Sequence, residues 1–114
     1  RVIHDDRVEI ALSQGQEAAE PGKISESDSA AFTLISKTVQ QVLPGAAVAP
    51  SLVFGATDSK RYYEVSKNQY RFQPMIFTEA ELKMLHGTNE KISLENLERA
   101  VRFYAQLLKN AAGN

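Results

Sequence analysis

Cysteine is absent from this chain of 114 residues, and every apolar run is short. Without cysteine there are no disulfides, no thiolate nucleophile and no cysteine-ligated zinc, although the cellular compartment stays open. No apolar run approaches the roughly 18 residues that are needed to cross a bilayer. The formal net charge of −1 gives no electrostatic reason to expect nucleic acid or an anionic membrane as a partner.

Glycine-rich phosphate loops, nucleophile elbows, paired-histidine metal motifs and internal repeats are also missing from the sequence. The sequence is 43% apolar and 24% charged, which is ordinary for a globular domain, and its length fits one domain. The chain opens on Arg1 rather than methionine, and a strand-like pattern begins almost at once. We therefore expect a piece of a longer polypeptide, so its start says nothing about secretion.

The beginning of the chain alternates polar and apolar residues and predicts a half-buried strand over residues 7–12. A stretch of about a dozen residues follows in which glycine and proline stand among polar residues, which is long for a connection inside one compact domain. We place a boundary there. The expected units are an end strand over 1–12, a linker over 13–26, a main domain over 27–110 and a frayed tail over 111–114.

Two long helices are predicted from apolar periodicity and from short polar residues that can cap a first turn. The first runs from Ser27 or Asp28 to Leu43, where Pro44 and Gly45 stop it. The last begins after Ser93 and carries an apolar stripe at alternating three- and four-residue steps, made of Leu94, Leu97, Val101, Tyr104 and Leu108. Shorter helices are expected after Asp58 or Ser59 and after Thr78, with Asp58 favoured as a cap.

Between the helices, two segments have the composition of strands. Residues 51–54 are nearly all apolar and predict a strand buried on both faces, and residues 68–76 predict another with Tyr70 and Phe72 on one face. Strands that alternate with helices predict an α/β fold with a mixed sheet and flanking helices. Ligands of such sheets bind at the carboxyl ends of strands, here in the loops 55–59 and 77–91.

The loop after Phe54 has two readings of about equal weight. Gly55 and Ala56 are small enough for backbone to approach a ligand, Thr57 offers a hydroxyl, and helix-start amides beyond it could hold an anion. The same residues also make an ordinary strand–turn–helix connection. Taken alone, His86 is more readily interpreted as an exposed or structural histidine than as a ligand.

Three motifs together carry a resemblance: residues 50–59 (PSLVFGATDS), 70–74 (YRFQP) and 86–90 (HGTNE). In this order they resemble the end of the zinc aminoacylase and carboxypeptidase S family, which includes succinyl-diaminopimelate desuccinylase and dipeptidases. The likeness covers about residues 21–110, and the strand at 7–12 resembles the last strand of the family's lid domain. It implies the C-terminal part of a phosphorylase/hydrolase-like zinc-peptidase catalytic domain, preceded by a remnant strand of the lid.

The resemblance also implies a reaction. Family enzymes cleave an amide bond in a dipeptide or N-acyl amino acid with water activated by two zinc ions. His86 stands where the family has a ligand to one of the metals. Thr57 would line the substrate pocket with Gly55 and Ala56 beside it, and Arg61 and Asn89 could reach a substrate carboxylate or the surroundings of a metal ligand.

The sequence departs from the family in what it lacks. The other metal ligands and the general base lie upstream in the family, and a catalytic zinc normally has three protein ligands. His4, Asp5 and Asp6 lie in the expected lid strand and have no suitable spacing. We therefore expect no catalytic residue in this chain and no activity from the chain alone.

Two kinds of function stay open from the sequence. One is a part of a di-zinc hydrolase that acts on a peptide or N-acyl amino acid and forms a homo-oligomer through exposed strand edges. The other is a separately folding, non-catalytic binding or oligomerisation module. The sequence separates neither dipeptidase from aminoacylase and carboxypeptidase nor one compartment from another.

Overall fold

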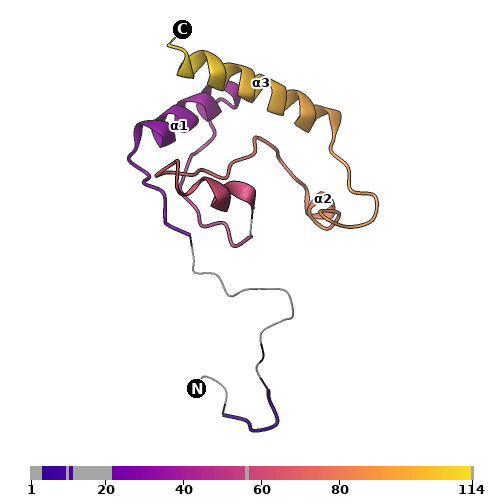
Figure 1. Ribbon diagram of the computed structural model, residues 1–114. Coiled ribbons are helices and arrows are strands. Elements are labelled where there is room, and N and C mark those ends of the chain that lie inside the picture. The colour runs from indigo at the N-terminus through magenta and orange to yellow at the C-terminus, as the bar shows by residue number, and fades with distance from the viewer. Residues whose placement is uncertain (1–3, 10, 12–21, 56, 114) are drawn as a thin grey trace.

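The structure is a computed structural model that describes residues 4–9, 11, 22–55 and 57–113. It contains the helices α1 (Ala30–Val42), α2 (Glu79–Leu82) and α3 (Leu94–Ala111), and the 3-10 helix η1 (Asp58–Tyr62). The two long helices lie side by side, and extended segments with the two short helices lie to one side of them (Figure 1). Within the described part of the chain, no helix combines the length and hydropathy that a membrane span requires.

Local capping explains where the helices begin: Ser93 caps α3 as predicted, whereas α1 begins at Ala30, later than the predicted Ser27 or Asp28, with Ser29 as its cap. The Ser29 hydroxyl accepts from the Phe32 N–H at 3.1 Å, and the Ser93 hydroxyl accepts from the Asn96 N–H at 3.1 Å. Each bond satisfies one of the amides that a first turn leaves without an intrahelical partner. Past the end of α1, Gly45 adopts a φ of 85°, which glycine reaches without the steric cost of a Cβ.

The contact between α1 and α3 holds the small core of the described residues. Its buried apolar members are Val39 of α1 and Ala100 and Phe103 of α3, and Phe103 is 2% exposed. The Phe72 ring packs on Phe103 with ring centroids 5.1 Å apart. Beside this core, the fully buried Thr38 hydroxyl donates to the Leu34 carbonyl and accepts from the Asn110 amide, so its burial leaves no polar atom unpaired.

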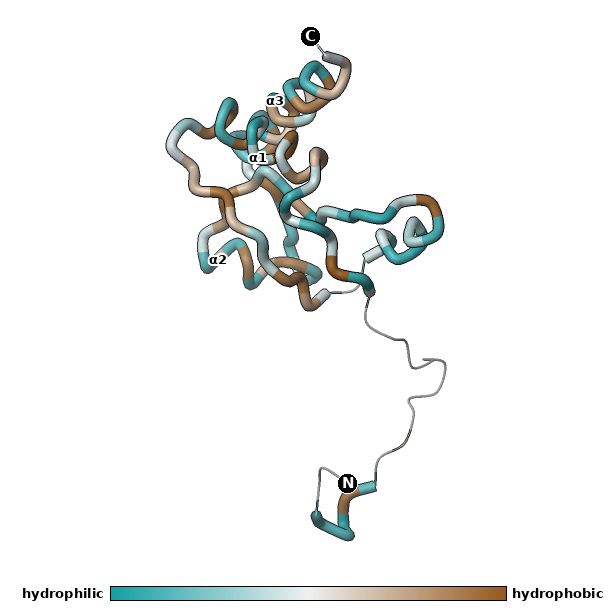
Figure 2. The backbone as a smooth tube through the Cα atoms, turned by 90° about the vertical axis from the view of Figure 1, so that its left-hand side faces the viewer, coloured by the Kyte–Doolittle hydropathy of each residue, from teal (hydrophilic) through white to brown (hydrophobic). Residues whose placement is uncertain are grey.

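The predicted apolar stripe of α3 does not form the core. Its five side chains are 48–84% exposed, whereas the neighbouring face, with Asn96, Ala100 and Phe103, packs inward. Hydrophobic segments occur along both long helices and along the extended chain (Figure 2). An apolar period of three and four residues therefore identified the helix but not the face that packs.

The predicted α/β fold with a mixed sheet is wrong, because the described residues contain helices and no strand. The segment 51–54, expected to be buried on both faces, has Leu52 62% exposed and Phe54 97% exposed. The segment 68–76 has no assigned strand either. Of the predicted strand at 7–12, residues 10 and 12 lie outside the described residues, and Arg7 lies in a turn.

Side chains explain how the extended segments satisfy backbone groups without a neighbouring strand. The Ser25 hydroxyl accepts from the Gln69 N–H at 2.7 Å and donates to the Gln69 carbonyl at 2.9 Å. The Asn96 amide makes the same pair of bonds with Ile76, both at 2.9 Å. Apolar, β-branched segments favour extended backbone, but a sheet also needs a second segment in register, which Pro50 and Pro74 disfavour by removing donors.

Asn96→Leu tests whether this side chain satisfies the backbone of Ile76 in place of a neighbouring strand. The substitution keeps the branching and the number of side-chain heavy atoms at a residue that is 2% exposed but leaves the N–H and C=O of Ile76 without their side-chain partner. We expect the free energy of unfolding in urea to fall by about 1–3 kcal/mol. Leu94→Ala on the exposed face of the same helix serves as control and should change it by less than about 0.5 kcal/mol. Equal effects of both substitutions would contradict this role of Asn96.

Candidate functional site

His86 lies at the end of a series of local turns that starts from α2. The Thr78 hydroxyl accepts from the Glu81 N–H at 3.3 Å, while the Glu81 carboxylate accepts from the Thr78 N–H at 2.8 Å, which is a capping box. After α2 the backbone turns again, with the Gly87 N–H donating to the Met84 carbonyl at 3.0 Å. The sequence between Thr78 and Gly87 thus fixes the loop through bonds among near neighbours.

The backbone of this loop is unusual at two positions. His86 has a φ of 59° and Asn89 a φ of 62°, and among the described residues these are the non-glycine residues with positive φ. Both belong to the motif His86–Glu90, and both are exposed. Left-handed backbone at a residue with a Cβ costs about 1 kcal/mol or more and concentrates at functional sites. The conformation therefore singles out the two motif residues that the sequence proposed as ligand and substrate neighbour.

Electrostatics connects α2 with the far end of the same loop. Hydrogen bonds from the Thr78 N–H and then from the Thr78 hydroxyl hold the pKa of the Glu81 carboxyl below its usual range. The positive charge of Lys91 lowers this pKa further, as a smaller effect. A carboxylate that accepts such bonds is favoured in its charged form. The ionised Glu81 side chain therefore helps to hold the turn that leads to His86.

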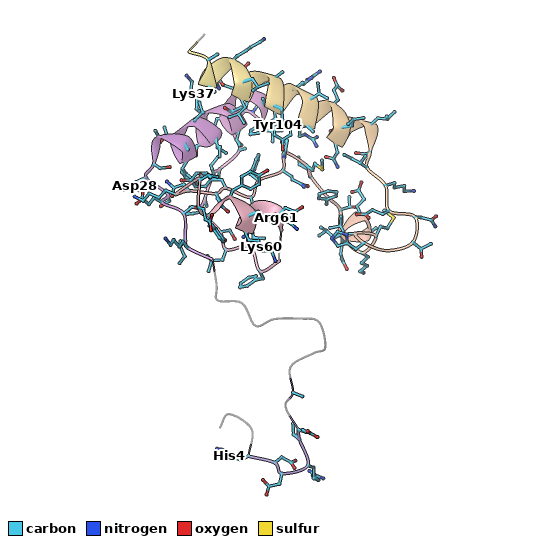
Figure 3. The ribbon with its side chains drawn as sticks, in the orientation of Figure 1. His4, Asp28, Lys37, Lys60, Arg61 and Tyr104 are labelled. Atoms are coloured by element: carbon cyan, nitrogen blue, oxygen red, sulfur yellow. The ribbon has the colours of Figure 1, made fainter. Side chains whose placement is uncertain are left out.

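The loop after Phe54 is organised by Thr57 rather than by Asp58. The Thr57 hydroxyl caps η1 by accepting from the Ser59 N–H at 3.2 Å, so the expectation of Asp58 as cap is wrong. Asp58 instead lies 3.4 Å from the Arg61 guanidinium, in an exposed pair that adds little to stability. Figure 3 shows Arg61 on η1, where Asp58, Arg61 and Tyr62 line an open hollow of about 480 Å³.

The two candidate loops are held separately. No hydrogen bond or ion pair among the described residues joins 55–63 to 84–93, and α2 contacts none of the other described helices. Gly55 and Thr57 are exposed, and Ala56 lies outside the described residues. His4 lies near the N-terminus, at the far end from the helices (Figure 3).

Arg71 is the residue near these loops that the sequence did not single out. Its guanidinium donates to the Ser59 hydroxyl at 2.8 Å, to the Gly55 carbonyl at 3.3 Å and to the Tyr63 hydroxyl at 3.2 Å. These three acceptors surround Thr57 along the chain. The position of Arg71 within the motif of residues 70–74 could have pointed to it in the sequence, but only the fold shows which loop its guanidinium reaches.

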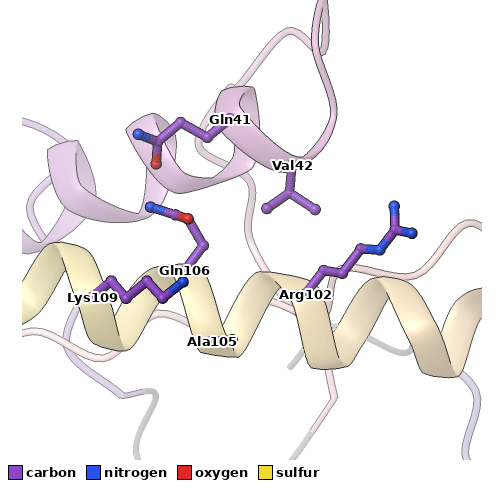
Figure 4. Close-up of a pocket in the computed structure, with 6 residues that line it drawn as sticks. All are labelled: Gln41, Val42, Arg102, Ala105, Gln106 and Lys109. Atoms are coloured by element: carbon purple, nitrogen blue, oxygen red, sulfur yellow. The ribbon is translucent and has the colours of Figure 1, made fainter.

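A second hollow lies between α1 and α3 (Figure 4). It measures about 340 Å³ and is lined by Gln41, Val42, Arg102, Ala105, Gln106 and Lys109. None of the residues proposed from the sequence lines it, and its polar groups are amides and cations of the helix surfaces. The candidate site therefore remains with the loops.

The sequence of residues 7–110 matches Peptidase family M20/M25/M40. Since the match extends over most of the chain, the chain belongs to this family, and the resemblance to aminoacylases and carboxypeptidase S is confirmed. No solved structure matches the chain.

Several curated relatives agree with this membership. A probable carboxypeptidase S-like 2 from Dictyostelium discoideum is 37% identical over 110 residues, which are 96% of this chain and 21% of that protein. The N-fatty-acyl-amino acid synthase/hydrolase of Homo sapiens is 34% identical, with 96% and 22% covered. Carboxypeptidase S of Saccharomyces cerevisiae is 30% identical, with 80% and 17% covered. The chain thus spans about a fifth of the length of the curated relatives it matches.

The family generally uses metal ions, and the residues present can be tested against that requirement. The part of the chain that the structure describes holds no group of three or more histidine, aspartate or glutamate side chains that could bind a metal. A catalytic zinc needs about three protein ligands and an open position. The described residues therefore do not fit a complete metal centre, and His86 stands alone.

The low pKa of Glu81 makes the α2 turn sensitive to acid. Because the folded-state pKa lies below the unfolded one, the contribution of Glu81 is present above the unfolded pKa and is lost as the pH falls through the folded pKa. We expect an NMR titration to show Glu81 ionising at lower pH than an unperturbed glutamate. Thr78→Ala should raise this pKa, since it removes the hydroxyl partner and weakens the cap.

Thr88→Ala, an exposed threonine in the same loop, is the matched control and should leave the titration of Glu81 unchanged. The amide signal of Gly87 should follow the protonation of Glu81 in the unsubstituted chain, because the turns run from α2 to Gly87. An unchanged Glu81 titration in Thr78→Ala would contradict the assigned cause.

Proposed function

We propose that this chain is the C-terminal part of a di-zinc hydrolase that cleaves the amide bond of a dipeptide or N-acyl amino acid. The observation that carries the proposal is the family match over residues 7–110. The relatives' names support amide hydrolysis: they are carboxypeptidase S proteins and N-fatty-acyl-amino acid synthase/hydrolases. Their greater length supports the view that most of the hydrolase lies outside these 114 residues.

Within this proposal, the two loops have different roles. His86 is one ligand of one zinc ion, and the other ligands come from the rest of the hydrolase. Thr57, with Gly55 and Ala56 beside it, lines the substrate pocket, and Arg61 and Asn89 lie at its margin. The left-handed backbone of His86 supports its role, because strain of this kind is retained where a precise side-chain direction matters. The hydrolase is further proposed to act as a homo-oligomer.

His86→Asn in the full-length hydrolase tests the ligand role. Asparagine tolerates positive φ, so the loop keeps its conformation while the imidazole is lost. We expect the zinc content, measured by atomic emission, to fall by about one ion per subunit, since a site that loses one of about three protein ligands binds its metal far more weakly. His4→Asn is the control and should retain the full zinc content. Retention of all zinc in His86→Asn would assign the histidine a structural role.

The isolated chain provides a second test. Because the described residues contain one candidate ligand, the purified 114-residue chain should not hydrolyse N-acyl amino acids or dipeptides above the buffer rate, with or without added zinc. The full-length hydrolase, assayed beside it by release of free amino acid, serves as positive control. Turnover by the isolated chain would contradict the division of the site between this part and the rest.

A further inference from the structure

Both ends of the loop that carries His86 are bonded to one residue of α3. The Asn96 amide bonds both backbone groups of Ile76, just before the loop, and the Asn96 N–H donates to the Ser93 hydroxyl, just after it, at 3.1 Å. We call residues 77–92 the His86 loop, and the place where Ile76 and Ser93 meet Asn96 its neck. A compact surface loop of about 6–16 residues with its ends together is an Ω-loop, a kind that frequently serves function.

The partners of the Asn96 amide fix its orientation. Its Oδ1 accepts from the Ile76 N–H at 2.9 Å and from the Arg99 guanidinium at 2.5 Å, while its Nδ2 donates to the Ile76 carbonyl at 2.9 Å. Arg99 is held in turn by the Glu95 carboxylate at 2.6 Å, and its side chain is only 13% exposed. A rotated amide would set donor against donor and acceptor against acceptor. The neck therefore holds Ile76 in one position on α3.

Among the described residues, no hydrogen bond or ion pair joins the His86 loop to a distant part of the chain. Its bonds run between near neighbours, such as the capping box at Thr78 and the ion pair between Lys83 and Glu79. The helix α2 lies apart from α1 and α3 and contacts neither (Figure 1). The internal shape of the loop is therefore local, whereas its direction relative to α3 depends on the neck.

We propose that Asn96 is a positioning residue of the hydrolase: by closing the neck, it sets the direction in which the loop presents His86 and Asn89 to the active centre. This inference rests on the proposed function, which places both side chains there. Both residues are exposed and have positive φ, so packing within this chain does not hold them. Since a displacement of about 1 Å can cost about 100-fold in rate, a loop that turns about an open neck would lose turnover.

Distances between two spin labels test the closure of the neck directly. The 114-residue chain has no cysteine, so Thr88→Cys in the loop and Ala105→Cys on α3, both at exposed positions, take up one label each. The intact neck should give one narrow distance distribution. Asn96→Ala should broaden this distribution, because it removes both bonds to Ile76 and leaves the local turns of the loop unchanged.

Asn110→Ala is the matched control. It removes an asparagine of the same helix whose amide also makes two bonds to distant residues, Thr38 and Gln41 of α1, but it does not touch the neck. Asn110→Ala should keep the narrow distance distribution. A distribution that stays narrow in Asn96→Ala, or that broadens equally in both variants, would overturn the proposal.

Kinetics of the full-length hydrolase separate positioning from stability. At a temperature where both variants are folded, Asn96→Ala should lower kcat for an N-acyl amino acid by about 10- to 100-fold and change KM by less than about threefold. Asn110→Ala should leave both constants within about twofold of the unsubstituted values. Equal kcat values in the two variants would overturn the proposal, since Asn96 would then only stabilise the fold.

Asn96→Asp serves where Asn96→Ala does not fold. It keeps the acceptor for the Ile76 N–H and loses only the donor to the Ile76 carbonyl, so kcat should fall in the same way but by less. An unchanged kcat in Asn96→Asp would then overturn the proposal. Failure of the unsubstituted full-length protein to hydrolyse any N-acyl amino acid or dipeptide would contradict the proposed function instead, and the label distances, which need no substrate, tell the two failures apart.

Discussion

The burial of Phe103, on the helix α3 that packs against α1, is the feature on which the rest of the described structure depends. Its ring meets Phe72 of the extended chain, so this side chain joins α3 to the middle of the sequence. Asn96, two turns earlier on α3, bonds both backbone groups of Ile76. Since the buried apolar residues are few, loss of this helix pair would release the extended segment and the loops at either end of it.

The two loops of the candidate site are attached to this frame in different ways. The loop with Thr57 is fixed by residues distant in sequence, through the Arg71 guanidinium and the close approach of Gly22 to Tyr63. The loop with His86 is fixed by its own capping box and turns. The conformation of the Thr57 loop therefore depends on the tertiary structure of this chain, whereas the backbone around His86 is held by bonds among near neighbours.

The difference between local and long-range contacts also explains which features could be predicted from the sequence. Ser29, Thr78 and Ser93 cap helices through amides three residues away, so their roles follow from the neighbouring sequence. A strand depends on pairing between distant segments, and the apolar letters of 51–54 carry no information about a partner. The same limit applies to α3, whose apolar stripe does not mark its packing face, and to Arg71, whose acceptors lie 8–16 residues away in the sequence.

The positive φ of His86 links the sequence motif to the proposed chemistry. Left-handed backbone at the exposed His86 costs about 1 kcal/mol or more, and its side chain is not buried in a way that would offset this cost. Local turns can impose the positive φ of His86, but they are not stabilised by the particular direction of its imidazole. In the proposed hydrolase, a bond from the imidazole to a metal would depend on that direction. The positive φ of His86 therefore supports the proposed division of the metal site between this chain and the rest of the hydrolase.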